Sequence, residues 1–323
     1  MKRIMVCGGA GFLGSHFVDR LLASGHTVEV LDDLRSGSLG NVAAARRSGG
    51  QFKFQNIDIT EASFGELVML RRPDIIVNLT SFTPSSSETV GALASVSSAV
   101  SVLEAARLGE VQKVVTVLPA TLLYGEVAAR DVPIKEGHLS EPRTVAEVLA
   151  RSVADMHTVY RDRHGVEFTV LAVGAVYGPR QRPEDSVVAS FVQAHHGSRA
   201  PIVHGGGKQT RDFIYVDDVV DAMVRAIDRA GGLVVNVGSG RQVAIADLWT
   251  AVAGRSAPAP RVSAARPHDV TRCALSPVRA RIQLGWSPFT DLEDGLAETL
   301  RSYASRQADE AEEDGAENVD DSQ

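Results

Sequence analysis

The stretch Ile4-Met5-Val6-Cys7-Gly8-Gly9-Ala10-Gly11-Phe12-Leu13-Gly14 places a short apolar run directly before a series of glycines. The run predicts a buried strand, and residues 13–23 have the pattern of a helix. Between a strand and a helix, Gly8 permits a tight turn, Gly11 lets the backbone approach a phosphate, and Gly14 allows the helix to pack closely on the strand. The stretch therefore predicts a loop that holds a dinucleotide pyrophosphate at a helix N-terminus.

A carboxylate follows at the end of the next apolar run. Asp32 lies 21 residues after Gly11, where it can hydrogen-bond both hydroxyls of an adenosine ribose. It would repel a 2′-phosphate, so NAD is predicted over NADP, although Arg35 keeps NADP open. Asp58 could either reach the adenine amine or cap a helix before Glu61. The predicted cofactor contacts are Gly8, Gly11, Phe12, Leu13, Gly14, Asp32, Asp33, Arg35, Asp58, Ile59, Leu79 and Thr80.

Short β-branched runs alternate with amphipathic segments over the first two-thirds of the chain. The predicted strands are residues 4–7, 28–31, 52–54, 75–79, 114–118 and 169–173, and the predicted helices are 13–23, 63–70, 90–107 and 145–163. This alternation predicts an α/β fold, a Rossmann-like doubly wound parallel sheet. Turn-rich stretches after Gly178 predict a smaller C-terminal lobe. The expected divisions are 1–178 for the Rossmann domain, with 212–240 returning to it, 179–304 for the lobe, and 305–323 for an acidic disordered tail.

The net charge of -7 is concentrated at one end of the 323-residue chain. Eight acids and no base lie between Asp309 and Asp321, so the rest of the chain carries -7 + 8 = +1. A body this close to neutral has no basic stripe for nucleic acid, and we expect no nucleic-acid partner.

The remaining composition limits the class of protein further. Cys7 and Cys273 are the two cysteines, too few for a disulfide framework or a cysteine-based zinc site, and no metal is predicted. The first apolar run is too short for a signal-peptide core, and no stretch was expected to reach the roughly 18 apolar residues of a membrane span. We therefore expect a cytoplasmic protein without a membrane partner.

Several motifs, taken together, resemble one known family. Residues 7–16, Cys7-Gly8-Gly9-Ala10-Gly11-Phe12-Leu13-Gly14-Ser15-His16, resemble the opening of the extended short-chain dehydrogenase/reductases, specifically the nucleotide-sugar epimerases and dehydratases. Residues 176–181, 208–219, 266–270 and 284–288 resemble later motifs of that family in the same order. The resemblance spans Lys2 to about Tyr303. It implies an NAD-binding Rossmann domain and a C-terminal substrate-binding lobe that grips a nucleoside-diphosphate sugar.

The resemblance also implies roles for individual residues. Arg211 and Arg266 match family arginines that pair with the substrate diphosphate, a task that suits the planar guanidinium. Asp269 matches a residue that orients a nucleotide ribose or its partner arginine. Surface or interlobe ion pairs are the alternative for all three. Family members commonly form homodimers through the helices that correspond here to 90–107 and 145–163.

The family's catalytic side chains are replaced by alanine. The family uses a Tyr and a Lys four residues apart on one helix, with a Ser or Thr beside them; these positions fall on Ala146, Ala150 and Ala120. The lysines of the chain are Lys2, Lys53, Lys113, Lys135 and Lys208, and none has a tyrosine four residues before it. The usual proton carrier and its pKa-lowering partner are therefore missing.

Other positions at the same end of the expected site are also small. Family positions for Arg, a bulky residue and Asn fall on Ala172, Gly174 and Ala175, and Asn78 replaces the usual His. We expect residues 120, 146, 150, 172, 174 and 175 to line one cavity that is roomier and less polar than a sugar-oxidising site.

A few side chains are candidates to replace the missing tyrosine. Glu147 neighbours Ala146, but one helical step turns it about 100° away, so a surface position is expected. Thr121 lies one step from Ala120 and is expected to project elsewhere. For Glu136, His138 and Glu141, which lie in the loop before the helix, a solvated surface position is the alternative. The candidate substitutes are Thr121, Tyr124, Glu136, His138, Glu141 and Tyr177.

Three functions remain open from the sequence. The first is an NAD-binding, epimerase/dehydratase-like enzyme, of isomerase or lyase type, that runs a non-standard reaction, a non-redox one included, on a nucleotide sugar or a bulkier, less polar substrate. The second is a non-catalytic protein that binds NAD or a nucleotide and acts through a partner. The third is an ordinary epimerase or dehydratase whose catalytic Tyr and Lys stand at other positions than 146 and 150, which the lysine positions disfavour.

Overall fold

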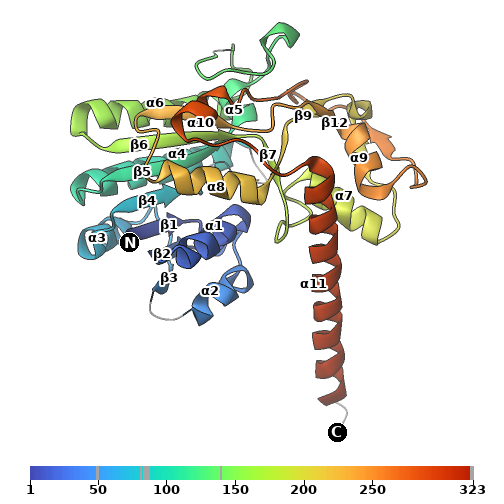
Figure 1. Ribbon diagram of the computed structural model, residues 1–323, viewed down its shortest axis with the longest axis horizontal. Coiled ribbons are helices and arrows are strands. Elements are labelled where there is room, and N and C mark those ends of the chain that lie inside the picture. Colours follow the sequence, from blue (N-terminus) through green and yellow to red (C-terminus); the bar gives the residue numbers. More distant parts are fainter. Residues whose placement is uncertain (49–50, 81, 83–87, 139, 321–323) are drawn as a thin grey trace.

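A seven-stranded parallel sheet forms the centre of the molecule in the computed structural model, which describes residues 1–48, 51–80, 82, 88–138 and 140–320 (Figure 1). The strand order is β11-β6-β5-β4-β1-β2-β3. The order reverses between β1 and β4, which creates a crevice beyond the carboxyl ends of these strands. The strands are β1 (Arg3–Cys7), β2 (Thr27–Asp32), β3 (Phe52–Asn56), β4 (Ile75–Asn78), β5 (Lys113–Pro119), β6 (Glu167–Val173) and β11 (Leu233–Val237).

Helices cover both faces of the sheet. On one face α1 (Phe12–Ala23) packs against α2 (Ala43–Arg47) and α8 (Val216–Ala226). On the other face α4 (Glu88–Leu108) packs between α3 (Ala62–Arg71) and α6 (Val145–His164). The predicted Rossmann-like doubly wound fold is therefore confirmed, and the predicted strands and helices agree with the observed ones to within two residues at each end.

A smaller lobe lies beyond the carboxyl ends of the strands (Figure 1). Short strand pairs build it: β7 with β10, β9 with β12, and β8 with β13. The chain then returns to the sheet through α8 and β11, and β11 pairs with β6. The lobe elements are β7 (Ala175–Tyr177), α7 (Val187–His196), β8 (Ile202–His204), β9 (Thr210–Arg211), β10 (Phe213–Tyr215), β12 (Val243–Ala244), α9 (Ile245–Ala253) and β13 (Arg261–Ser263), and shorter helices are η1 (Leu39–Val42), α5 (Ala120–Tyr124), η2 (Ala129–Asp131), η3 (Gly205–Gly207) and α10 (Val278–Gln283).

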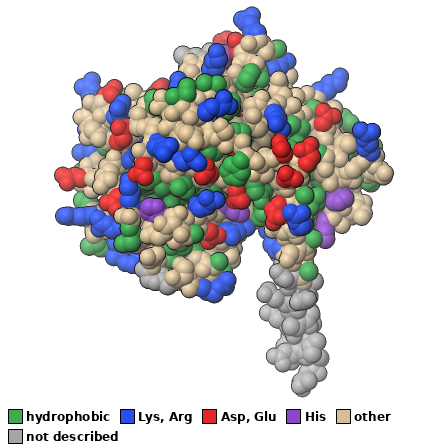
Figure 2. Space-filling view, viewed as in Figure 1, with side chains coloured by type: hydrophobic (Ala, Val, Ile, Leu, Met, Phe, Trp, Pro, Cys, Tyr) green, Lys and Arg blue, Asp and Glu red, His purple; other side chains and the backbone are tan. Residues whose placement is uncertain are grey.

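The end of the chain differs from the expectation. Helix α11 (Leu292–Asp320) leaves the body and projects outward (Figure 1), so the segment expected as a disordered tail from 305 is helical as far as Asp320. Glutamate and alanine are frequent in this stretch and are good helix formers, which accounts for the difference. Residues 321–323 lie outside the described part. On the body, basic and acidic side chains are interspersed over the face seen in Figure 2.

One helix is more apolar than the sequence patterns indicated. Thr89–Leu108 of α4 is long and apolar enough, by length and composition alone, to cross a membrane. In the fold it packs against β4, β5, α3 and α6, and 44% of this stretch is buried. Its apolar composition fits a helix that covers a sheet on one side and packs on a neighbouring helix on another.

The contact between α1 and β1 depends on Gly14. A Cβ atom at this position would overlap the Gly8 carbonyl oxygen and lie 2.8 Å from the Gly9 Cα. Gly8 itself has φ +80°, a left-handed conformation that glycine adopts without strain. Both glycines are therefore required by the backbone, as the sequence pattern predicted.

A histidine is buried between α6 and the sheet. The His157 side chain is 1% exposed, with Nε2 2.8 Å from Thr116 Oγ1 and Nδ1 2.7 Å from the Val153 carbonyl oxygen. A carbonyl only accepts, so Nδ1 donates to Val153. Burial lowers the pKa of His157 to about 4, because the charged ring would lose its hydration.

We predict that His157 makes the fold sensitive to mild acid. The unfolded chain binds a proton there near pH 6.5, whereas the folded protein binds it near pH 4. Between these values the unfolded state holds more protons, so the free energy of unfolding falls as the pH drops, by roughly 3 kcal/mol in all. Urea unfolding from pH 7.5 to 4.5 should show a smaller decrease in His157→Gln than in wild type. The exposed His195→Gln is the control, and equal decreases in all three proteins would contradict the prediction.

A second prediction concerns the glycine loop. Gly14→Ala should lower the free energy of unfolding by about 1–3 kcal/mol, because the loop must shift to admit the methyl group. Gly65→Ala in α3 is the matched control, since its Cβ would meet open space; there alanine should add about 0.5–1 kcal/mol. Thermal unfolding monitored by circular dichroism measures both, and an unchanged midpoint in Gly14→Ala would show that the close contact is not a constraint.

Candidate functional site

The glycine loop leaves the start of α1 open for an anion. Gly11 precedes the helix, and among the described residues no side chain caps this end and no acid lies in the first turn. The first N–H groups of a helix lack intrahelical acceptors and carry partial positive charge. The backbone at Phe12, Leu13 and Gly14 thus fits the pyrophosphate predicted for it.

Asp32 lies beside this loop at the end of β2. Its Oδ2 accepts from the Ala10 N–H and its Oδ1 from the Leu34 N–H, each at 2.9 Å. Burial raises the pKa of Asp32, although both N–H groups favour the charged form. The carboxylate is therefore held against the loop, where the pattern predicted a ribose contact.

The basic residue that kept NADP open is already paired. Arg35 contacts Asp33 Oδ2 and Asp58 Oδ2, both at 2.5 Å. Burial alone would raise the pKa of Asp58, but hydrogen bonds from the backbone and hydroxyl of Thr60 and the Arg35 charge hold it below its usual range. Asp58 Oδ1 accepts both Thr60 bonds in the turn before α3. It does not cap the helix, because Glu61 is the N-cap residue and, among the described residues, no side chain bonds to the first N–H groups there. The adenine contact of Asp58 stays a prediction.

The remaining predicted cofactor contacts lie near the same loop or in the core. Thr80 donates its N–H and hydroxyl to Asn78 Oδ1 at 3.1 and 2.7 Å, which fixes the chain just after β4. A Cβ on Gly8 would lie 3.2 Å from the carbonyl carbon of Leu79, so this segment flanks the glycine loop. Ile59 is buried in the core.

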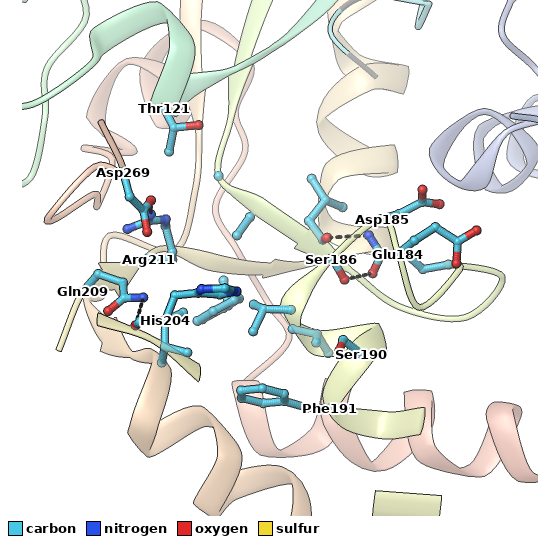
Figure 3. Close-up of a pocket in the computed structure, with 18 of the residues that line it drawn as sticks. Thr121, Glu184, Asp185, Ser186, Ser190, Phe191, His204, Gln209, Arg211 and Asp269 are labelled. Carbon is cyan, nitrogen blue, oxygen red and sulfur yellow. Dashed lines mark hydrogen bonds and ion pairs between the residues drawn. The ribbon is translucent and has the colours of Figure 1, made fainter. Parts of the chain in front are cut away.

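A cavity of about 730 Å³ lies between the ends of β5 and β6 and the smaller lobe. Arg211, Arg266 and Asp269 line it together, as the resemblance implied. Figure 3 shows Thr121 above the Arg211 and Asp269 pair, with Gln209 and His204 below them. The cavity therefore offers the paired Arg211 and Asp269 in one part and the Thr121 hydroxyl toward the sheet.

Arg211 is fixed by three acceptors. Its Nη1 donates to the carbonyls of Thr210 at 2.8 Å and Val270 at 2.6 Å, and its Nη2 donates to Asp269 Oδ1. These bonds leave Nε–H and one Nη2 hydrogen of the guanidinium for a ligand. Arg266 is exposed and lines the same cavity. Guanidinium groups that reach one cavity are suited to bind the oxygens of a diphosphate.

The opposite wall contains the start of α7. Ser186 caps this helix by accepting the Ala189 N–H at 3.1 Å, and its hydroxyl donates to Gln181 Oε1 at 2.8 Å (Figure 3). Gln181 in turn donates to the Val176 carbonyl at 3.1 Å. Asp185 on this wall is paired with Arg182 at 2.8 Å. Val176 and Gln181 belong to the 176–181 motif, whereas Arg182, Asp185 and Ser186 lie outside every motif identified in the sequence.

The prediction that six small residues line one cavity is wrong. Gly174 and Ala175 line the cavity, but Ala120 and Ala150 are 0% exposed and Ala146 is 1% exposed. Ala172 is likewise buried. Helix α5 packs against α6, and the four alanines lie in the interior and not at the cavity wall.

Gly174 illustrates the same effect at the cavity wall. A Cβ there would lie 2.5 Å from the Asp212 carbonyl oxygen, because β7 and β10 pair beside it and Ala175 N–H donates to that oxygen at 2.7 Å. The glycine therefore permits a close backbone approach, which differs from the expected enlargement of the cavity.

Thr121 is the one candidate substitute that reaches the cavity, although the sequence analysis expected it to project elsewhere. Tyr124 is buried and donates to Asn236 Oδ1 at 2.6 Å, and Tyr177 is buried and donates to the Leu292 carbonyl at 3.3 Å. Burial raises the pKa of both tyrosines. They are thus anchored away from the cavity in their neutral form.

The loop acids are not placed to replace the tyrosine. Glu136 was considered a mobile acid, but its Oε1 accepts the Asn236 N–H at 3.0 Å and its Oε2 lies 3.7 Å from Arg279 Nε. His138 is half-buried and Glu141 is exposed, and neither lines the cavity.

Glu147 is buried at 2% exposure, so its predicted surface position is wrong. Its N–H donates to Thr144 Oγ1 at 3.2 Å, and its Oε2 accepts the Arg143 N–H at 2.7 Å. This arrangement closes the start of α6 in the manner of a capping box. The Thr-x-x-Glu spacing of residues 144–147 was a sequence signal for it.

Comparisons with known proteins agree with this geometry. Residues 4–238 match the NAD dependent epimerase/dehydratase family. A UDP-glucose 4-epimerase of Mycolicibacterium smegmatis is 37% identical, over 94% of this chain and 99% of that protein.

Solved structures show the same relationship. The UDP-glucose 4-epimerase of Thermotoga maritima, solved with UDP-glucose, has a TM-score of 0.87 at 29% identity, and that of Thermus thermophilus, solved with NAD, has 0.84 at 28%. Each comparison covers 94% of this chain and 99% of the other. The chain therefore belongs to the NAD-dependent epimerase/dehydratase family of the extended short-chain dehydrogenase/reductases.

Proposed function

We propose that this protein binds NAD and a nucleotide sugar, or a bulkier and less polar nucleotide-linked substrate, and does not run the hydroxyl oxidation of its relatives. One observation carries the proposal. The Arg211, Arg266 and Asp269 wall is complete, whereas the catalytic positions Ala120, Ala146 and Ala150 are small and buried. Binding groups are present without the usual proton-transfer pair.

The cofactor site supports NAD in preference to NADP. When bound, NAD would supply a hydride acceptor or donor at its nicotinamide. The first turn of α1 would hold its pyrophosphate, and Asp32 its adenosine ribose. A 2′-phosphate would meet the Asp32 charge, and Arg35 would first have to leave Asp33 and Asp58.

The substrate end of the cavity suits a group with few polar contacts. Around Thr121 the wall is formed mainly by apolar residues, Pro119, Val173, Gly174, Ala175 and Val176. A threonine hydroxyl can orient a substrate oxygen by hydrogen bonding, but without a cationic neighbour it does not hold a negative charge near neutral pH. An isomerase or lyase reaction without net redox is therefore favoured over oxidation.

A non-catalytic role is the alternative. The burial of the catalytic positions favours it, because a binding protein that acts through a partner needs no proton carrier. In both cases we place the protein in the cytoplasm. Its partners would be small molecules and a second copy of itself, with neither nucleic acid nor membrane among them. Identifying the ligand that co-purifies, by mass spectrometry, distinguishes a bound substrate from a bound nucleotide alone.

The first prediction of the proposed function concerns turnover. Wild-type protein should bind NAD and UDP-glucose by calorimetry, NAD more weakly than its relatives do because no lysine holds the nicotinamide ribose, yet form neither NADH nor UDP-galactose. No group stands where the hydroxyl proton must be taken, and loss of such a group typically costs about 10²–10⁴ in rate. Conversion of UDP-glucose by the wild type would contradict the proposal.

A gain-of-function variant complements this test. Ala146→Tyr with Ala150→Lys and Ala120→Ser should produce NADH absorbance or epimerisation, while each single change should not, because a tyrosine without its lysine stays protonated. All three positions are buried, so added side chains should also cost about 1–3 kcal/mol of stability. Turnover by Ala146→Tyr alone would contradict the requirement for the pair.

The second prediction is a homodimer. Helices α4 and α6 pack side by side and expose large apolar side chains, among them Leu93, Val100, Val145, Val148 and Val159. Such a face permits a four-helix bundle with a second copy. Light scattering at micromolar concentration should give a dimer, and Leu93→Glu with Val148→Glu should give a monomer. Val278→Glu on α10, equally exposed, is the control; a monomeric wild type would reject the dimer.

A further inference from the structure

Residues 268–271 form a strip that supports Arg211 at the wall of the cavity. On one side the strip bonds to β9: Thr210 N–H donates to the Thr271 carbonyl at 3.0 Å, and Arg211 Nη1 donates to the Val270 carbonyl at 2.6 Å. Asp269 accepts from Arg211 Nη2. The position of the Arg211 guanidinium thus depends on this strip.

The other side of the strip is held by the loops around α5 and α6. Arg143 Nη2 donates to the His268 carbonyl at 3.1 Å and lies 3.5 Å from the Asp269 carbonyl oxygen. Glu126 Oε2 lies 3.5 Å from the same nitrogen and accepts the Thr271 N–H at 2.7 Å. The Arg143 guanidinium and the Glu126 carboxylate therefore contact consecutive peptide groups of the strip.

Arg143 is itself fixed by the start of α6. Its N–H donates to Glu147 Oε2 at 2.7 Å, and Glu147 is buried. This hydrogen bond to a buried carboxyl group fixes where the Arg143 backbone lies. The contacts run without a break from α6, through Arg143 and the strip, to Arg211 in the cavity.

We propose that Arg143 is a positioning residue for the anionic part of the ligand. It contacts no ligand itself; it holds residues 268–271 so that Asp269 keeps Arg211 aimed into the cavity. The inference rests on the proposed function, because the anion is taken to be the diphosphate of a nucleotide. Glu126 holds the same strip from its other end. The opposite wall with Ser186 and Asp185 has its own hydrogen bonds and ion pair, which do not involve the strip.

The alternative is that Arg143 only fastens one loop to another. That role would change stability and leave ligand selectivity unchanged. A positioning role instead lowers affinity for the nucleotide diphosphate and spares affinity for NAD, whose predicted contacts, the glycine loop and Asp32, lie outside the strip.

The test compares Arg143→Gln with Arg130→Gln in the full chain. Arg130 lies exposed in η2 of the same loop and is the matched control. In ligand-free protein, hydrogen exchange of a peptide spanning 266–273 should be faster in Arg143→Gln alone. By calorimetry, its Kd for UDP should rise about tenfold, because a charge-assisted bond to the strip is lost, with the Kd for NAD within twofold of wild type. Arg143→Lys should recover part of the loss.

Further variants separate the outcomes. If Arg143→Gln lowers overall stability, Glu126→Gln, which keeps the side-chain volume, should still raise the Kd for UDP and spare NAD. In the Asp269→Asn background, Arg143→Gln should raise the Kd for UDP by a smaller factor than it does in the wild type, because both substitutions act on Arg211. Unchanged exchange, an unchanged Kd for UDP, or full additivity would overturn the inference. Failure of the wild type to bind UDP would instead contradict the proposed function. In that case the hydrogen-exchange rate of the 266–273 peptide alone would decide whether Arg143 holds the strip.

Discussion

The close approach of α1 to β1 is the constraint on which the rest of the molecule depends. Gly14 has no room for a side chain beside Gly8, so the helix starts immediately beyond the strand. This start lies beside the point where the strand order reverses, and its N–H groups face the crevice there. The lobe then completes the crevice on the far side, with Arg211 and α7 on facing walls. A backbone contact near the N-terminus thus determines where charged ligand groups can be held.

The fold and the cavity position of Arg211, Arg266 and Asp269 could be predicted from the sequence because both depend on patterns of neighbouring residues. Strand and helix runs have characteristic periods, and the motifs with Gly14, Asp32 and Arg211 lie in regular elements or directly after them. What could not be predicted depended on packing between distant segments. Neither the burial of Tyr124 against Asn236 nor the pairing of Glu136 with Arg279 is encoded in neighbouring residues. The helical continuation to Asp320 could not be predicted from the run of acids alone, since acidic runs are typical of solvated tails, although glutamate and alanine also favour a helix.

The positions expected to be catalytic belong to a different part of the structure from Arg211. Ala146 and Ala150 lie on α6 and Ala120 begins α5, and all three are buried in the interior. At Gly174 a Cβ would lie 2.5 Å from the Asp212 carbonyl oxygen, so a neighbouring backbone takes the space there. The Arg211 guanidinium depends instead on the carbonyls of Thr210 and Val270 and on Asp269. Side-chain changes at the buried alanines therefore need not disturb the groups that hold Arg211.

The pairing of Arg35 with Asp33 and Asp58 bears on how a protein of this kind could change cofactor during evolution. Replacing Asp32 by a neutral residue would remove the repulsion toward a phosphorylated ribose. The nearby arginine would still be committed to two carboxylates, and releasing it would leave both charges unbalanced on the surface. Accommodating a phosphorylated ribose would therefore call for changes at more than one of these positions, because the repelling carboxylate and the paired arginine belong to separate contacts.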